Sequence, residues 1–290
     1  MKIIPFHEPQ SGTCSYLLAD EDAGKAAVID PVWVYDAVSG VCDDGFVQDM
    51  MSTARDEGWA IDWVLETHAH ADHLTAANIV RKECGAKIVI GKGITKIQEN
   101  FSKVYNLADQ NTDGTQFDLL VSEGDSFLVG NIEVNVMEAP GHTPDSVAFL
   151  IGDAAFIGDT LFKPASGTAR CDFPGGDAAM LFDTVSRIHS LPDGTRLFLC
   201  HDYPEKDGAF VSEVLVEDSR ENNIHISSST DRSSFIKIRT ERDAGLNLPK
   251  LILPALQVNI RAGIVPEAES NGASYLKIPL NVSIAELLGS

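Results

Sequence analysis

Short runs of apolar residues, each bounded by turn-forming residues, recur through the first two hundred positions of the chain. Runs of this length and setting are typical of buried strands. Two longer runs turn in the middle, at Gly130-Asn131 and at Gly152-Asp153, so each predicts a pair of strands. The pattern predicts strands within residues 16–20, 25–30, 63–67, 87–93, 125–141, 146–160 and 195–200.

Four stretches between these strands have the pattern of helices, and two of them end at Gly58 and Gly85, the residue type that often ends a helix. The helices are expected within residues 45–58, 74–85, 94–106 and 177–191. Strands with helices inserted singly predict an α/β fold of two packed sheets with helices outside, an αββα sandwich. After about residue 208 the pattern becomes mostly helical, so we expect a single domain over residues 1–290 with a C-terminal helical extension.

The composition suits a large core, because 44% of the 290 residues are hydrophobic and only 22% are charged. The net charge of -21 argues against nucleic-acid partners and against anionic membranes. An anionic substrate would therefore need local positive charge at its site.

The cysteines are odd in number, widely spaced and without a CxxC pair, which predicts a reducing compartment rather than a disulfide framework. They are Cys14, Cys42, Cys84, Cys171 and Cys200. The first ten residues lack the apolar run of a signal peptide, and no run of about 18 apolar residues occurs. We therefore expect a cytoplasmic protein.

The segment ETHAHADHLTAA, residues 66–77, concentrates potential metal ligands: His68, His70, Asp72 and His73. In an extended segment, residues two apart point the same way, so His68, His70 and Asp72 can face one cavity. A lone histidine is as often an ordinary polar residue as a ligand, but a cluster of this density strongly favours a metal site for zinc or iron.

Three more candidates follow the ends of apolar runs, where loops carry function: His142 in APGHTPDS, Asp159 in FIGDTLF and His201 in LFLCHDY. Taken singly, Asp159 could cap a turn and His201 could bond a neighbour. Together with the first cluster they extend the predicted metal site. His7, His189 and His225 lack such settings, and we interpret them as structural or surface residues.

With THAHADH, His142, Asp159 and His201 in this order, the sequence resembles the metallo-β-lactamase fold superfamily. The resemblance implies an αββα sandwich with the metal site at one edge of the sheets. In dinuclear members, residues matching His68, His70, His142 and Asp159 hold one metal. Residues matching Asp72, His73 and His201 hold the second, and Asp159 bridges the two.

Further segments look like the bacterial persulfide dioxygenase branch, which is related to glyoxalase II. They are residues 167–178, 197–203, 246–263 and 275–281. This resemblance implies one Fe(II) per chain, held by His68, His142 and Asp159, because two histidines and one carboxylate form the triad of non-haem iron oxygenases. His70, Asp72, His73 and His201 would then orient the ligands or remain from a second site.

The implied reaction converts glutathione persulfide, O2 and water into glutathione and sulfite, and Asp72 is a candidate to assist the release of sulfite. Residues 232–261 hold six basic and two acidic side chains, which suits the carboxylates of glutathione. We expect Arg261, Arg170 and Tyr203 to bind the tripeptide. Arg170 could instead pair with Asp172 and brace a loop.

Other readings stay open. A dinuclear zinc hydrolase of a glutathione thioester, the glyoxalase II reaction, would need the same ligands. A metal-dependent sensor without turnover and an exported β-lactamase are less favoured. Cys171 and Cys200 lie near ligand motifs, but a buried cysteine usually acts as a small hydrophobe, so we expect Cys171→Ser to retain turnover. The sequence is compatible with a homodimer but does not determine the oligomeric state.

Overall fold

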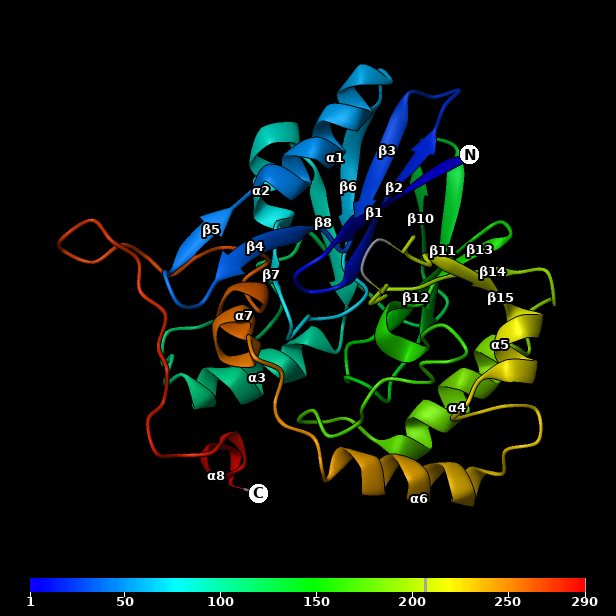
Figure 1. Cartoon of the computed structure of the whole chain (residues 1–290). Coiled ribbons are helices and arrows are strands. Elements are labelled where there is room, and N and C mark those ends of the chain that lie inside the picture. Colours follow the sequence, from blue (N-terminus) through cyan, green and yellow to red (C-terminus); the bar gives the residue numbers. More distant parts are fainter. Residues whose placement is uncertain (206–207, 290) are drawn as a thin grey trace.

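The computed structural model describes residues 1–205 and 208–289, and two six-stranded sheets lie at its centre (Figure 1). The first sheet has the order β1-β2-β3-β6-β8-β9. Its strands are β1 (Lys2–Glu8), β2 (Thr13–Asp20), β3 (Lys25–Ile29), β6 (Ala60–Leu65), β8 (Lys87–Gly91) and β9 (Leu119–Val121). The strands from β3 to β9 run parallel, whereas β1, β2 and β3 pair antiparallel.

The second sheet has the order β10-β11-β12-β13-β14-β15, and only β13 and β14 pair in parallel. Its strands are β10 (Ser126–Val129), β11 (Ile132–Glu138), β12 (Val147–Ile151), β13 (Ala154–Phe156), β14 (Arg196–Phe198) and β15 (Glu213–Leu215). A small third sheet joins β5 (Val41–Asp43), β4 (Val32–Asp36) and β7 (Leu74–Thr75).

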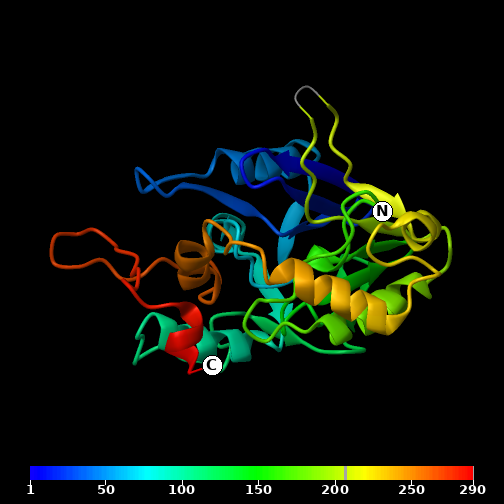
Figure 2. The same cartoon turned by 60° about the horizontal axis from the view of Figure 1, so that its bottom comes forward.

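Helices cover the outer faces of both large sheets, which gives the αββα layering that the sequence predicts. They are α1 (Gly45–Asp56), α2 (Ala77–Cys84), α3 (Ile94–Val104), α4 (Ala178–His189), α5 (Val216–Asn222), α6 (Arg232–Asp243), α7 (Ile252–Asn259) and α8 (Ile284–Leu288). Figures 1 and 2 show α1 and α2 on the side of the first sheet, and α4 and α6 on the side of the second.

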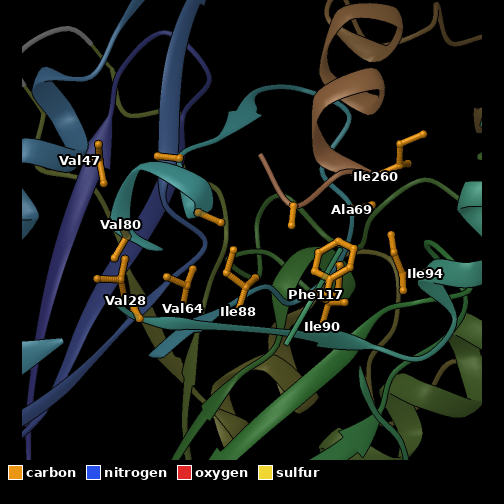
Figure 3. Close-up of a cluster of buried hydrophobic side chains, with 14 of the residues drawn as sticks. Val28, Val47, Val64, Ala69, Val80, Ile88, Ile90, Ile94, Phe117 and Ile260 are labelled. Atoms are coloured by element: carbon orange, nitrogen blue, oxygen red, sulfur yellow. The ribbon is translucent and has the colours of Figure 1, made fainter. Parts of the chain in front are cut away.

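Three apolar clusters hold these layers together. Between the sheets, Tyr16, Leu65 and Phe149 belong to one cluster of fully buried side chains. On the outer face of the first sheet, Val28, Val64 and other residues pack against α1, α2 and α7 (Figure 3). A third cluster joins the second sheet to α4 and α6.

The predicted strands and helices between residues 16 and 200 are all present, with boundaries shifted by a few residues. The helix expected within 74–85 begins only at Ala77, because Leu74 and Thr75 form β7. Gly85 ends it in the left-handed conformation at φ 73°, with its N–H donating to Arg81 O. β1, the β4–β5 hairpin and β9 were not predicted.

The helices after residue 208 are accompanied by a further strand and by long irregular segments. β15 completes the edge of the second sheet, so this region is part of the sandwich rather than a separate appendage. Residues 264–283 form an extended arm that loops out past α7 and returns to α8 (Figures 1 and 2). Among the described residues, no helix is long and apolar enough to cross a membrane.

Candidate metal centre

The seven predicted metal-site residues meet at one edge of the sandwich, each in a connection that follows a strand. His68, His70, Asp72 and His73 follow β6, and His142 lies between β11 and β12. The short 3-10 helix after β13 carries Asp159, and His201 follows β14 by three residues. Strands of both sheets therefore bring these residues to the same place. The sequence predicted this, because each candidate follows the end of an apolar run.

Gly158 permits the close approach of two of these loops. Its φ is +52°, and a Cβ built there would lie 2.7 Å from Thr67 Oγ1 and 3.3 Å from His68 Nδ1. A side chain at this position would push Asp159 away from His68. The glycine in the GDT motif is thus required by both backbone conformation and space.

His68, His142 and Asp159 form one compact set, with one candidate ligand atom from each lying within 4.8 Å of the others. His68 Nε2 lies 3.9 Å and His142 Nε2 lies 3.7 Å from Asp159 Oδ2. The other carboxylate oxygen, Asp159 Oδ1, is buried without a hydrogen-bond partner among the described residues. Two ring nitrogens and one carboxylate therefore face a common point.

Nδ1 of His68 and Nδ1 of His142 both make hydrogen bonds within the protein, and these bonds fix the tautomers of the two rings. His142 Nδ1 donates to the backbone carbonyl of Arg170 at 2.7 Å. Thr67 Oγ1 donates to Asp30 Oδ2 at 2.8 Å, so it can only accept from His68 Nδ1, 3.0 Å away. Both Nε2 atoms then present lone pairs toward Asp159, the arrangement that metal-binding histidines usually have. The residues fit a divalent metal.

His70 has different surroundings. Its Nε2 lies 3.1 Å from Asp30 Oδ1 and 3.5 Å from Glu66 Oε2, while its Nδ1 is buried and unpartnered within the described chain. Burial opposes a charged ring, but the carboxylates of Asp30 and Glu66 outweigh burial and raise the pKa of His70 well above its ordinary value. The neighbouring ring of His68 has a lowered pKa, because burial dominates and His70 and His142 add to it.

Asp72, His73 and His201 are less well converged. His73 Nδ1 lies 3.1 Å from Asp72 Oδ2, so this ring nitrogen and carboxylate oxygen bond to each other. His201 Nε2 lies 3.5 Å from Asp72 Oδ2 and 3.3 Å from Asp159 Oδ1. In the described part of the chain, no set of ligand atoms that all lie within 4.8 Å of one another includes all three of these residues. Burial raises the pKa of Asp72, but His73 and His201 reverse this effect and hold it well below the usual range.

A cavity of about 480 Å³ opens onto Asp72, His142, Asp159 and His201. Tyr203, one of the three predicted substrate residues, lies in its wall with its ring stacked on that of His201 at 6.0 Å between centroids. A Cβ at Gly12 would overlap the Tyr203 ring, so this glycine makes room for it.

Arg170 lines the same cavity, but its guanidinium is already engaged. Nε and Nη2 donate to the two carboxylate oxygens of Asp172 at 2.5 Å each, and Nη1 donates to Asn247 O at 2.7 Å. The alternative prediction, that Arg170 braces a loop, describes these contacts. Through its carbonyl oxygen the same residue orients His142.

Arg261 lies elsewhere. Its Nε donates to Gln110 Oε1 at 2.8 Å, in a separate cavity of about 600 Å³ whose lining includes none of the metal-site residues. Within the basic stretch 232–261, Arg239, Arg242 and Lys250 line the metal cavity, and Arg239 is paired with Asp243. His225, interpreted from the sequence as structural, lies in that wall too, and its Nδ1 accepts from Thr168 N.

The chain matches the metallo-beta-lactamase superfamily over residues 10–201. The protein belongs to this superfamily. It is 41% identical to a probable metallo-hydrolase of Burkholderia pseudomallei, with 97% of this chain and 99% of the relative covered. It is also 41% identical to glyoxylase B2 of Dictyostelium discoideum, with 97% of both chains covered.

A second group of relatives is named for a different reaction. The mitochondrial persulfide dioxygenase ETHE1 of Mus musculus is 32% identical over 263 residues, which cover 89% of this chain and 87% of that protein. The crystal structure of ETHE1 from Myxococcus xanthus matches with a TM-score of 0.73 and 28% identity, covering 91% of this chain and all of that one. The similarity includes most of the C-terminal region.

Proposed function

We propose that the protein is a persulfide dioxygenase that uses one Fe(II), bound by His68, His142 and Asp159. The observation that carries the proposal is the geometry of this set: two Nε2 lone pairs and one carboxylate converge, while the second ring nitrogens are held by protein acceptors. Iron bound there would supply open positions at which a persulfide sulfur and O2 can meet. The similarity to ETHE1 proteins supports this reaction over others of the superfamily.

The proposed overall reaction is that of glutathione persulfide, O2 and water giving glutathione, sulfite and two protons. The terminal sulfur loses four electrons, which O2 accepts, and the sulfur–sulfur bond breaks as the glutathione thiol leaves. The third oxygen atom of sulfite comes from water. We assign to Asp72, which bonds His73 and lines the cavity, the role of accepting a proton from that water.

The substrate's carboxylates need cations in a chain of net charge -21. Arg242 and Lys250 are exposed in the wall of the metal cavity, and within the described chain neither side chain has an ion-pair partner. We assign the glutathione carboxylates to these two side chains, with Tyr203 donating its hydroxyl. Arg170 is assigned the role of holding His142 in place.

The test combines metal analysis with turnover. Protein purified without oxygen should contain about one iron per chain, and it should consume O2 and release sulfite with glutathione persulfide. His68→Ala, His142→Ala and Asp159→Ala should each lose iron and O2 uptake, while His7→Ala, outside the cluster, retains both. Two zinc ions per chain, with no O2 uptake after iron loading, would contradict the proposal.

A second candidate is a dinuclear zinc hydrolase of glutathione thioesters. The presence of Asp72, His73 and His201 beside Asp159 favours it, as does the similarity to glyoxylase B2. Hydrolysis of S-lactoylglutathione by the zinc-loaded protein, at a rate that exceeds O2 uptake by the iron-loaded protein, would establish this reaction instead.

A further inference from the structure

A second cavity adjoins the metal cavity. Its volume is about 310 Å³, and Ala71, His142, Arg170 and Pro249 line both this cavity and the metal cavity. His142 therefore stands where the two meet. The Arg170–Asp172 ion pair lies in the same partition.

This second cavity differs chemically from the first. Its wall is mainly apolar: Phe173, whose ring centroid lies 6.4 Å from that of His142, lines it together with Leu248 and Ile252. Arg242 and Lys250 are not among its lining residues, and the arginine that does line it, Arg170, is already paired with Asp172. The carboxylates of an ionic tripeptide would lose hydration here without an unpaired cation among the described lining residues to replace it.

The C-terminal helix α8 forms part of the wall of this cavity, with Ile284, Ala285 and Leu288 among the lining residues. Ser283 and Glu286 bond reciprocally across the first turn of α8, and Ile284 is only 9% exposed in the core that also contains α3 residues (Figure 1). The wall is therefore built and anchored, although α8 has five residues. Its residues are contributed by a segment more than a hundred positions from His142 in the sequence.

We propose that this apolar cavity is the binding and entry site for O2, a role that rests on the dioxygenase function proposed above. O2 is small, neutral and apolar, and apolar surfaces inside protein cavities take up molecules of this kind, including xenon. Glutathione persulfide, seated on Arg242 and Lys250, fills the polar approach. The second cavity leaves O2 a separate path to His142 and the metal.

The test uses the full-length, iron-loaded protein and two readouts. Crystals held under xenon pressure should show xenon between Phe173 and α8 in the unmodified protein and none there in Ala285→Trp. The same variant should raise KM for O2 at least fivefold. At saturating O2, the KM of Ala285→Trp for glutathione persulfide should stay within twofold of that of the unmodified protein, because Arg242 and Lys250 are unchanged.

Two further variants make the result specific. Val282→Trp adds the same bulk to the same tail at a position outside the lining of this cavity, so its KM for O2 should not change. Leu248→Trp narrows the cavity from a lining residue outside α8 and replaces Ala285→Trp if that variant does not fold. Absence of xenon from the cavity, or an unchanged KM for O2 in the narrowed variant, would overturn this inference alone. Absence of O2 uptake by the unmodified protein would overturn the proposed function itself.

Discussion

Thr67 is the residue on which the orientation of His68 depends. It is 1% exposed, and its hydroxyl joins Asp30 Oδ2 to His68 Nδ1. Thr67→Val keeps the shape but removes both bonds, so we expect iron affinity to fall roughly 10–100-fold. Asp30 also loses a hydrogen-bond donor, which costs about 1–3 kcal/mol in the free energy of unfolding.

Competition with a chelator measures the first effect of Thr67→Val, and urea denaturation of the metal-free protein measures the second. Thr53→Val is the control, because its hydroxyl bonds only within α1 at the surface. Unchanged iron affinity in Thr67→Val would show that His68 is oriented by other contacts.

Arg242 and Arg261 offer a comparison of two arginines from one basic stretch. Arg242 lines the metal cavity, whereas Arg261 lines another. A hydrogen bond to a charged group contributes about 1.5–3 kcal/mol, so Arg242→Ala should raise KM for glutathione persulfide roughly tenfold or more. Arg261→Ala should change it less than twofold, with iron content constant in both. The reverse order would place the tripeptide in the cavity of Arg261.

Cys171 is expected to be chemically inert despite its place beside Arg170. Burial, with a contribution from Asp243, raises the pKa of its thiol to about 12. The raised pKa keeps it neutral from pH 7 to pH 9, and only the thiolate is nucleophilic. Iodoacetamide at pH 8 should therefore label exposed Cys84 and leave Cys171 unmodified, as read by peptide mass spectrometry.

Turnover in Cys171→Ser should stay within a few-fold of that of the unmodified protein. A hundredfold loss with iron retained would imply a catalytic thiol.

At the scale of elements, α6 is tied to the loop that carries Arg170 through a buried ion pair. Arg239 and Asp243 are 4% and 5% exposed, Arg239 also donates to Thr168 O, and Asp243 Oδ2 accepts from Cys171 N. Removing one partner of such a pair costs about 3–5 kcal/mol, because the other charge stays buried. We expect this loss in the unfolding free energy of Asp243→Asn.

The same helix provides the control for Asp243→Asn. Lys237 and Glu241 form an exposed pair with the same spacing, at 3.9 Å. Glu241→Gln should cost less than about 0.5 kcal/mol, since solvent screens the exposed pair. Similar losses in both variants would mean that the Arg239–Asp243 pair contributes no more than a surface pair.

The elements that the sequence revealed are those whose local pattern agrees with their burial. β2 is buried at every position and α1 ends where Glu57 and Gly58 follow it, so both could be predicted. β1 was missed because its residues are only partly buried and include Pro5. The arm 264–283 has no regular pattern, and contacts such as Gln257 with the backbone of Lys277 hold it.

Some residues of the candidate site could likewise be predicted from the sequence, and others could not. The metal-site residues carry a local signal, since each follows an apolar strand, and the structure brings them together. The placement of Arg242, Lys250 and Arg261 depends on how α6, α7 and the segment between them pack on the sandwich. Neighbouring basic residues on this stretch face different cavities, and no local pattern distinguishes them.

At the scale of the whole molecule, the net charge of -21 should make stability depend on salt. Like charges repel in the compact state, and raising ionic strength from about 0.01 M to about 0.1 M shortens the Debye length from roughly 30 Å to roughly 10 Å. A gain of about 1 kcal/mol corresponds to roughly 1.5–2 °C in Tm for a chain of this size. Calorimetry at pH 7 should show this rise in Tm with sodium chloride.

Near the isoelectric point of about 4.6 the net charge is small, so at pH 5 the same salt should have little effect on Tm. A Tm that falls with salt at pH 7 would mean that attractive ion pairs, such as Arg196 with Asp153 and Glu213, outweigh the overall repulsion.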